Sequence, residues 1–182
     1  MTVRGANYER RPNDLYETPE ETVDALLSVW RPGKKVCDPC CASGRILRAL
    51  RRHGHEADGA DLIGGGYDFI NDPWRWPKHD VVTNPPYGDR QGRLALAFVV
   101  RALEVARTRV AMLLPMDFDS GRSRVGIFRD CPKFAGKIVL LNRIRWFDDE
   151  AGSTNHAWFI WHRYQRDPPT ISYASQNYGE KR

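Results

Sequence analysis

The sequence predicts an α/β protein with a doubly wound, mostly parallel sheet. Short apolar runs alternate along the chain with amphipathic, helix-like stretches, and the first apolar run passes through small residues directly into a helix. We expect strands near residues 35–38, 56–61, 80–83, 109–114, 137–141 and 156–162, and helices near residues 44–53, 93–107 and 121–129. This alternation is typical of a sheet that helices cover on both faces.

A further helix is expected before the first strand. Thr18-Pro19-Glu20-Glu21 forms a capping box with proline at the first helical position, so the helix begins there and runs to Trp30. Arg31-Pro32-Gly33 ends it. Residues 1–15 are polar, and we expect them to form a loose N-terminal segment.

The first strand leads into a loop suited to binding a ligand. The strand ends at Asp38, and the small residues Cys40-Cys41-Ala42-Ser43-Gly44 follow before a helix begins near Ile46. Small residues let the backbone approach a ligand closely, and the helix start presents free N–H groups beside it. An acid at this place repels a pyrophosphate and attracts an ammonium or sulfonium group. The next acid, Asp61, ends the second strand-like run and suits the two hydroxyls of a ribose.

The tetrapeptide Asn84-Pro85-Pro86-Tyr87 directly follows the strand expected at 80–83. An exocyclic amine on a base is a poor nucleophile, and it improves when two acceptors take its hydrogens. The side-chain oxygen of Asn84 and the carbonyl of Pro85 are two such acceptors. The prolines fix two successive φ angles, and Tyr87 offers a flat face to a planar substrate. The alternative is a proline-rich turn that only ends a strand.

Together, these two motifs resemble those of the S-adenosylmethionine-dependent amino-methyltransferases, and most closely those of the phage-type and γ-ordered DNA adenine-N6 methyltransferases. The resemblance includes the order of the motifs, with the cofactor loop at 36–47 before the catalytic loop at 84–87, and it extends over residues 16–162. It implies a seven-stranded Rossmann-like methyltransferase sheet, S-adenosyl-L-methionine as the cofactor, and N6-methyladenine in DNA as the product.

The resemblance also implies which residues bind the cofactor. Tyr16 and Thr18 lie in the element that closes over the methionine end of the cofactor. Asp68 would accept a hydrogen bond from the amino group of the cofactor's adenine, with Asp72 as a rival, and Phe69 would lie against the adenine ring. The complete implied set is Tyr16, Thr18, Asp38, Ala42, Gly44, Asp61, Leu62, Asp68 and Phe69.

Ala42 departs from the family pattern, which usually has glycine at this position. Alanine fits there without strain only if its φ angle is negative. The departure therefore bears on the affinity for the cofactor.

Basic residues suggest a polyanionic partner. The formal net charge is +5 and the isoelectric point is about 9.2. Arg90 and Arg93 follow the catalytic loop, and Arg145 precedes two aromatic residues, which is the combination that a phosphate backbone and an unstacked base would use. Arg122, Arg124 and Arg143 are further candidates. The alternative is an ordinary basic surface.

Aromatic residues near the end of the chain are candidates for stacking on a target base. The resemblance assigns this place to Trp146 or Phe147, before a polar loop and the strand at 156–162. His156 could donate a hydrogen bond in the site, and the alternative is a structural histidine. Strand periodicity predicts that Trp158 and Ile160 share one face of the sheet and that Phe159 and Trp161 share the other.

Three of the four cysteines, Cys37, Cys40 and Cys41, lie close together near the cofactor loop. They are expected to be reduced, and no metal is expected because no second cysteine pair or suitably spaced histidine accompanies them. We also considered Cys40 as the nucleophile of a cytosine-C5 methyltransferase. Its position argues against this, because that chemistry requires a thiol in the loop that here contains Asn84.

At 182 residues the chain is expected to form one domain, with residues 16–163 as the catalytic domain and residues 164–182 as a polar tail. No run of residues suits a membrane span or a signal peptide, so a cytoplasmic enzyme is expected. No separate target-recognition domain is visible. We therefore expect selectivity to come from short loops, from a homodimer or separate recognition subunit, or from relaxed recognition.

Two alternative functions remain open from the sequence. One is a methyltransferase for RNA bases or for a protein glutamine amide, since both substrates suit the same pair of acceptors. The other is a catalytically silent scaffold subunit that binds nucleic acid. Ala42 favours the scaffold, whereas the intact segment 84–87 opposes it.

Overall fold

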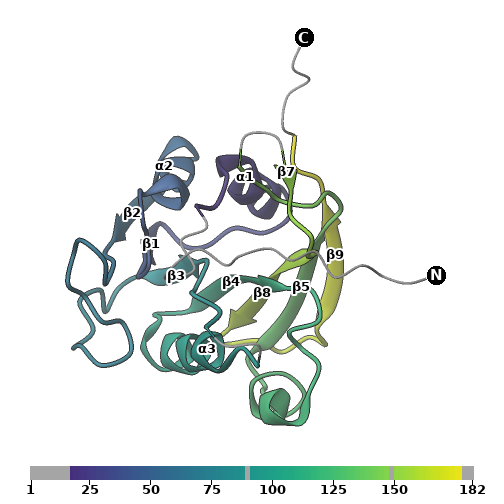
Figure 1. Ribbon diagram of the computed structural model, residues 1–182. Coiled ribbons are helices and arrows are strands. Elements are labelled where there is room, and N and C mark those ends of the chain that lie inside the picture. Colours follow the sequence, from purple (N-terminus) through teal and green to yellow (C-terminus); the bar gives the residue numbers. More distant parts are fainter. Residues whose placement is uncertain (1–16, 89–90, 148–149, 178–182) are drawn as a thin grey trace.

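Seven strands form one mixed sheet in the computed structural model, which describes residues 17–88, 91–147 and 150–177 (Figure 1). The predicted α/β class is therefore confirmed. A separate antiparallel pair consists of β6 (Arg145–Phe147) and β7 (Glu150–Ala151). In spatial order the strands of the large sheet are β2 (Glu56–Gly59), β1 (Lys35–Asp38), β3 (Asp80–Thr83), β4 (Arg109–Pro115), β8 (His156–His162), β5 (Phe134–Leu140) and β9 (Thr170–Ala174).

Strand direction determines where the functional loops meet. The neighbours β2, β1, β3 and β4 are parallel, whereas β8 is antiparallel to both β4 and β5, and β9 is parallel to β5. Parallel strands end at the same edge of a sheet. The loops that follow Asp38, Gly59 and Thr83 are therefore brought together.

Helices cover both faces of the sheet. In Figure 1, α1 (Glu20–Val29) and α2 (Arg45–Arg52) lie above the sheet and α3 (Arg93–Val105) lies below it. Trp158 and Ile160 belong to the core beneath α1 and α2, whereas Phe159 and Trp161 belong to the core beneath α3, which confirms the predicted alternation. None of the helices in the described residues is long and apolar enough to span a membrane.

Asp80 joins the amino ends of three adjacent strands. Its side chain is buried, and its two oxygens accept hydrogen bonds from the backbone N–H groups of Gly33 at 2.7 Å, Thr108 at 3.1 Å and Arg109 at 3.0 Å. These donors lie before β1 and at the start of β4. One carboxylate thus satisfies three backbone groups that a loop would otherwise leave without a partner.

Two elements differ from the sequence expectations. The helix expected at 121–129 is a short 3₁₀ helix, η2 (Arg122–Ile127). No strand was expected after residue 162, yet β9 forms within the segment 164–182 that was expected to be a polar tail. Ile171 and Tyr173 on β9 are 61% and 62% exposed, so the strand lacks the buried alternation that would mark it in the sequence. Backbone pairing with β5 recruits it into the sheet.

We predict that Asp80→Ala lowers the free energy of unfolding by about 3 kcal/mol, because three partly buried N–H groups lose the buried carboxylate that accepts their hydrogen bonds. Urea unfolding followed by circular dichroism measures this change. Asp58→Ala is the matched control, since Asp58 lies on β2 with an exposed side chain and, among the described residues, pairs with His79 alone. The control should change stability by less than about 1 kcal/mol. Equal effects of the two variants would contradict the role given to Asp80.

Candidate active site

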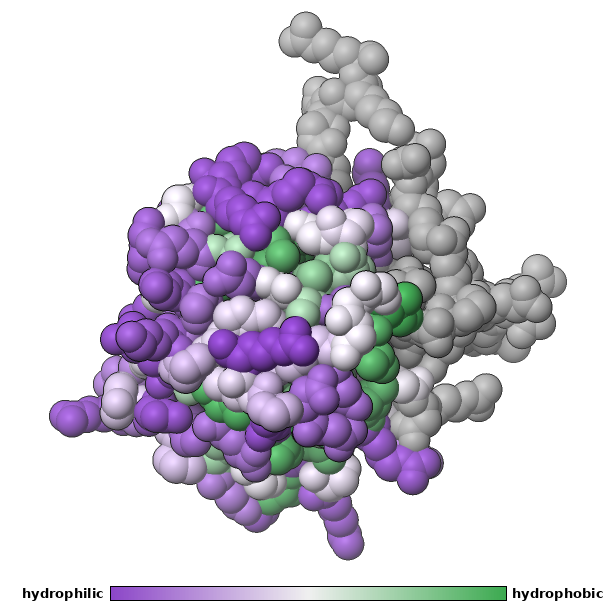
Figure 2. All heavy atoms as spheres, turned by 90° about the vertical axis from the view of Figure 1, so that its left-hand side faces the viewer, coloured by the Kyte–Doolittle hydropathy of each residue, from purple (hydrophilic) through white to green (hydrophobic). Residues whose placement is uncertain are grey.

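A cleft of about 500 Å³ lies at the carboxyl edge of the parallel strands. A smaller recess of about 20 Å³ adjoins it and shares Cys40, Ala42 and Asn84 with it. Figure 2 views the molecule from the side of β2 and shows apolar atoms at the surface between hydrophilic regions. Of the residues predicted from the sequence, Ala42, Asp61, Leu62, Asp68, Phe69, Asn84 and Pro86 line the cleft, and Thr18, Asp38, Ala42 and Asn84 line the recess.

Asp38 is the buried acid of this site. Its Oδ1 accepts hydrogen bonds from the Thr83 hydroxyl at 2.7 Å and from the Cys40 backbone N–H at 3.2 Å. Its Oδ2 is buried and has no hydrogen-bond partner among the described residues. Burial raises the pKa of Asp38 from 3.8 to about 7, although the hydrogen bonds from Thr83 and Cys40 oppose the shift. A carboxylate left half-satisfied in this way favours a cation that can reach it.

The loop after β1 contains a strained alanine. Ala42 has a φ angle of 43°, and it is the one non-glycine residue with positive φ among the described residues. Alanine would fit here without strain only with a negative φ, so the backbone at Ala42 is strained. Gly44, at φ 81°, occupies a similar conformation at the start of α2, where glycine tolerates it.

Asp61 holds this loop in place. Its Oδ2 accepts a hydrogen bond from the Ala42 N–H at 2.9 Å, and its Oδ1 accepts one from the Ile63 N–H at 2.8 Å. Each carboxylate oxygen can still accept another hydrogen bond. Asp61 can therefore bind two ligand hydroxyls while it keeps the strained loop closed.

The segment between β2 and β3 places Asp68 and Phe69 at the cleft. Asp68 accepts hydrogen bonds from the Asn71 side chain at 2.7 Å and from two backbone N–H groups, and these bonds lower its pKa. Phe69 is 2% exposed and packs against Trp74 and Phe98 at ring distances of 5.7 and 5.2 Å. Asp72, the rival of Asp68, does not line the cleft, and it accepts a hydrogen bond from the Asp68 backbone.

The segment 84–87, predicted to be the catalytic loop, contains a side-chain amide that is held on both sides. The Nδ2 of Asn84 donates to the Thr18 hydroxyl at 3.0 Å, and the Tyr87 hydroxyl donates to the Oδ1 of Asn84 at 3.0 Å. Thr18 is buried. The family resemblance implies that Thr18 lies at the methionine end of a cofactor, and in the structure Thr18 lines the recess and contacts Asn84. Pro85 is buried, and Pro86 lines the cleft.

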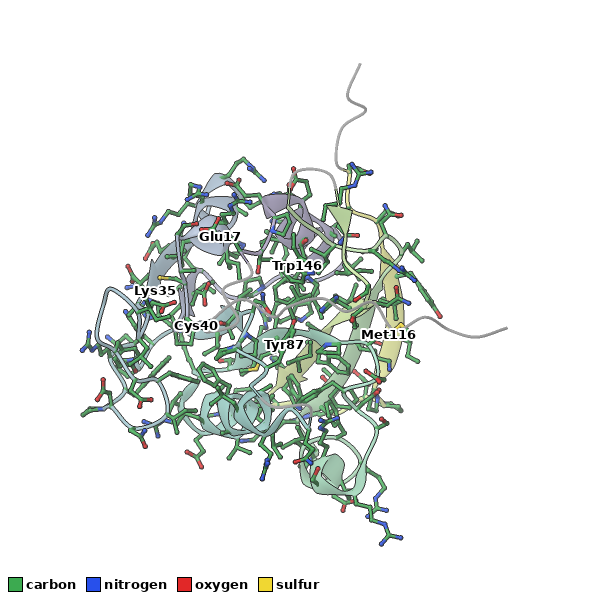
Figure 3. All side chains as sticks on the ribbon, in the orientation of Figure 1. Glu17, Lys35, Cys40, Tyr87, Met116 and Trp146 are labelled. Atoms are coloured by element: carbon green, nitrogen blue, oxygen red, sulfur yellow. The ribbon has the colours of Figure 1, made fainter. Side chains whose placement is uncertain are left out.

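Tyr87, His156 and Trp146 form an aromatic cluster, in which His156 is stacked on Tyr87 and Trp146 meets His156 edge-on. The ring centroids of Tyr87 and His156 are 6.0 Å apart, and those of His156 and Trp146 are 5.3 Å apart. Figure 3 shows Cys40, Tyr87 and Trp146 in the middle of the view, and Met116 to their right. His156 is buried, its Nδ1 bonds to the Thr154 carbonyl at 3.1 Å, and burial lowers its pKa to about 4. Because His156 is neutral and packed against two rings, the structure favours the alternative that it is a structural histidine.

The predicted arginines divide into several groups. Arg93 and Arg145 are exposed, at the start of α3 and on β6, and Arg122 is exposed on η2. Arg124 is instead part of the scaffold, because its guanidinium donates to the carbonyls of Phe118, Ser120 and Gln91 and lies 4.0 Å from the centre of the Phe118 ring. Three predicted contacts lie outside the described side chains: Tyr16, Arg90 and Phe147.

The structure adds residues that the sequence analysis missed. Cys40 and Thr83 lie between Asp38 and Asn84, and Tyr67, Leu94 and Phe98 line the cleft. Thr83 could have been noticed as a polar residue at the end of an apolar strand. Burial raises the pKa of the Cys40 thiol well above its ordinary value, which disfavours a nucleophilic thiolate. Within the described part of the chain, no cluster of side chains could hold a metal ion.

No protein-family model matches the chain, and no curated protein matches it significantly. Solved structures match it in fold. A protein from Listeria monocytogenes assigned as a class I S-adenosylmethionine-dependent methyltransferase superposes with a TM-score of 0.62, at 12% identity over 91% of this chain and 68% of that chain. A subunit from Vibrio vulnificus, assigned as the modification subunit of a type I restriction enzyme, gives 0.58 at 16% identity over 92% of this chain and 48% of its own.

A third match is a protein from Pyrococcus horikoshii assigned as an RNA methyltransferase, with a TM-score of 0.55 at 12% identity over 79% of this chain and 80% of that chain. This chain spans about half the length of the type I modification subunit. The fold is thus the Rossmann-like fold of the S-adenosylmethionine-dependent methyltransferases, as the resemblance implied.

We predict that Ala42→Gly raises the free energy of unfolding by about 1 kcal/mol, because glycine removes the strain of the positive φ angle. Urea unfolding measures the change. Ala60→Gly in the neighbouring loop is the control. Since Ala60 does not have positive φ, glycine there should lower stability by about 0.5–1 kcal/mol. A loss of stability in Ala42→Gly would show that the loop is not strained.

We predict that Asp38→Asn raises the free energy of unfolding of the ligand-free protein, relative to wild type, by about 2.5 kcal/mol more at pH 8 than at pH 5. Between pKa 3.8 and about 7 the folded protein keeps a proton on Asp38 that the unfolded chain has lost, so wild-type stability from this group falls as the pH rises through this range. His156 acts in the opposite direction, because its lowered pKa makes stability rise from pH 4 to 6.5. Because His156 is present in both proteins, its contribution cancels when the variant is compared with wild type. A variant-minus-wild-type difference in the free energy of unfolding that does not change with pH would contradict the prediction.

Proposed function

We propose that the protein is an S-adenosylmethionine-dependent N-methyltransferase that acts on the exocyclic amine of adenine in DNA and yields N6-methyladenine. One observation carries the proposal. The amide of Asn84 is oriented by Thr18 and Tyr87 at a cleft, and the adjoining recess is lined by Asp38, whose buried Oδ2 has no partner among the described residues. The site thus combines an acceptor for an amine with an anionic place for a cationic ligand.

The residues at the cleft fit the cofactor. The unpaired Oδ2 of Asp38 suits the methionine ammonium, and Asp61 keeps acceptor capacity for the ribose hydroxyls. Phe69 offers an apolar wall for the adenine, and Asp68 is the acid beside it. When bound, the cofactor supplies a methyl group on a positively charged sulfur.

Asn84 and Pro85 would bind the target amine. Oδ1 of Asn84 accepts a hydrogen bond from Tyr87, and an amide oxygen has two lone pairs, so this oxygen would be the acceptor for one amine hydrogen. The Pro85 carbonyl would accept the other hydrogen. The two bonds hold the nitrogen lone pair toward the methyl group, and the methylated amine then loses its proton to water. Rotation of the base out of its stack costs a few kcal/mol, which contacts with Tyr87 and Trp146 would offset.

The choice of DNA rests on three supports: the family resemblance of the two motifs, the net charge of +5, and the modification subunit of a restriction enzyme among the fold matches. The match covers 48% of that subunit's own chain, and target recognition by a second copy or a separate subunit is part of the proposal. RNA is the second candidate, favoured by the match to a protein assigned as an RNA methyltransferase.

Transfer of labelled methyl groups tests the proposal directly. The protein is incubated with labelled S-adenosylmethionine and, separately, with unmethylated DNA, structural RNA and bulk protein, and nucleosides are identified by mass spectrometry. We expect N6-methyladenine in DNA. If only RNA or only protein is labelled, that class replaces DNA as the proposed substrate. If the protein binds the cofactor but labels none of the three, the scaffold alternative is favoured.

We predict that Asn84→Ala lowers the rate of methyl transfer about a hundredfold to a thousandfold, because one acceptor for the reacting amine is lost. The Kd for the cofactor, measured by calorimetry, should change less than about twofold, since Asn84 would act on the substrate. Asn142→Ala is the matched control, because Asn142 is exposed and bonds to the Gln176 carbonyl away from the cleft. Near wild-type turnover in Asn84→Ala would show that the catalytic loop is assigned wrongly.

A further inference from the structure

Strand β9 forms an open edge of the large sheet. It is last in the spatial order of strands, and among the described residues no strand pairs with its outer side (Figure 1). The carbonyl of Ala174 accepts a hydrogen bond from the Leu141 N–H at 2.9 Å, so the backbone groups of Ala174 face β5. Since backbone groups alternate in direction along a strand, those of Ile171 and Tyr173 face away from β5. These two residues therefore offer N–H and C=O groups to a further strand.

The exposed side chains of β9 are apolar. Ile171 is 61% exposed and Tyr173 is 62% exposed. Ile171 is the register partner of Lys137 on β5, and Lys137 is the partner of Phe159, which belongs to the core beneath α3. Ile171 and Tyr173 thus lie on the same face of the sheet as α3. They form an apolar rim along its last strand.

The two edges of the sheet differ in charge. The opposite edge strand, β2, has the exposed acids Glu56, which lies 3.7 Å from Lys35, and Asp58, which lies 2.9 Å from His79. Charged side chains on an edge strand discourage pairing with another chain. Residues 170–177, in contrast, contain no aspartate, glutamate, lysine or arginine. The edge formed by β9 therefore lacks the protection that β2 has.

The strand β9 is complementary to a second copy of itself. In an antiparallel pair centred on Ser172, Ile171 of each copy lies opposite Tyr173 of the other, and each such pair exchanges two N–H···O bonds. A β-branched residue opposite an aromatic one is a favourable cross-strand pair, and no like charges meet. The two-fold arrangement also closes, whereas a head-to-tail contact would continue into a filament.

We propose that β9 is the interface for a second copy of this chain, with the two β9 strands antiparallel about a two-fold axis at Ser172. The inference goes beyond the proposed function and does not rest on it. A strand of five residues makes a small interface. We therefore expect a reversible dimer with a Kd on the order of 10 μM.

The second copy would lie away from the candidate active site. The strands β4, β8 and β5 separate β9 from β3. Because β9 runs in the same direction as β1 and β3, antiparallel pairing puts the carboxyl edges of the two sheets on opposite sides. Neither copy then contributes a residue to the cleft of the other. In this arrangement target recognition would fall to a separate subunit.

The first test measures association of the full chain by sedimentation velocity at concentrations from about 1 to about 100 μM. The double variant Ile171→Lys, Tyr173→Lys places like charges opposite each other and should raise the Kd at least about tenfold. The double variant Ile171→Lys, Tyr173→Glu places opposite charges together in this register and should restore association. Tyr164→Lys, which changes an exposed aromatic residue outside β9, should leave the Kd unchanged.

The second test locates the axis. In the proposed register the two copies of Ser172 form a non-hydrogen-bonded pair with Cα atoms about 4.5 Å apart, within reach of a disulfide. Mild oxidation of Ser172→Cys should therefore give a covalent dimer, with the bond identified by peptide mapping. Ser175→Cys is the matched control, because Ser175 is exposed but lies three positions from the axis and out of reach of its copy. Wild type defines the background from the native cysteines.

The outcomes are separate from those for methyl transfer. A monomer at every concentration without the Ser172→Cys cross-link overturns the inference, including the case in which the edge pairs within its own chain. A dimer that persists in the double-lysine variant lies elsewhere and also overturns it. If that variant does not fold, as judged by circular dichroism, the cross-link decides. The folded double-lysine variant should keep the wild-type rate of any methyl transfer. A wild-type dimer that methylates nothing supports this interface and overturns the proposed function alone.

Discussion

The arrangement of the site depends on one buried carboxylate, that of Asp38 at the end of β1. Three parallel strands end at the same edge, and the loops that follow them surround this group. Thr83 and the Cys40 backbone satisfy one oxygen, while the other has no partner among the described residues. Removing a carboxylate from water costs free energy, and here the cost is only partly offset. A cationic ligand at the second oxygen of Asp38 would offset the rest of this free-energy cost.

The same region contains a second source of instability. Ala42 adopts a conformation that suits glycine, and the bond from its N–H to Asp61 holds it there. Strained and half-satisfied groups of this kind tend to occur where a protein binds ligands, since the rest of the fold stabilises them. The well-satisfied Asp80 at the opposite ends of the strands is one such stabilising element. The stabilising Asp80 thus lies at one edge of the sheet, and the candidate ligand site lies at the opposite edge.

Around the segment 84–87, the residues that orient Asn84 come from distant parts of the chain. Thr18 precedes α1, and Tyr87 is backed by His156 at the start of β8. His156 stays neutral because it is buried, so the stack adds no charge near the amide. Arg124, which could have faced a phosphate, instead closes the loop after β4 onto Gln91. Several residues near the site therefore act as scaffold.

The sequence by itself determined the parts of this protein that follow from local rules. The acid and small residues after β1, the Asn-Pro-Pro-Tyr segment after β3 and the alternation of Trp158 and Phe159 are all readable over a few neighbouring residues, because strand periodicity and loop chemistry are local. The Rossmann-like sheet follows from the order of these units. The carboxyl-edge location of Asp38, Asp61 and Asn84 follows from the same order.

Only the tertiary structure decided the rest. The exposed strand β9 pairs with β5, and Ala42, with its positive φ, donates its N–H to the side chain of Asp61, 19 positions further along the chain. Thr18 meets Asn84 across 66 positions of the chain, and Thr83 meets Asp38 across 45. Such contacts depend on how whole helices and strands pack, so a short stretch of neighbouring residues cannot predict them.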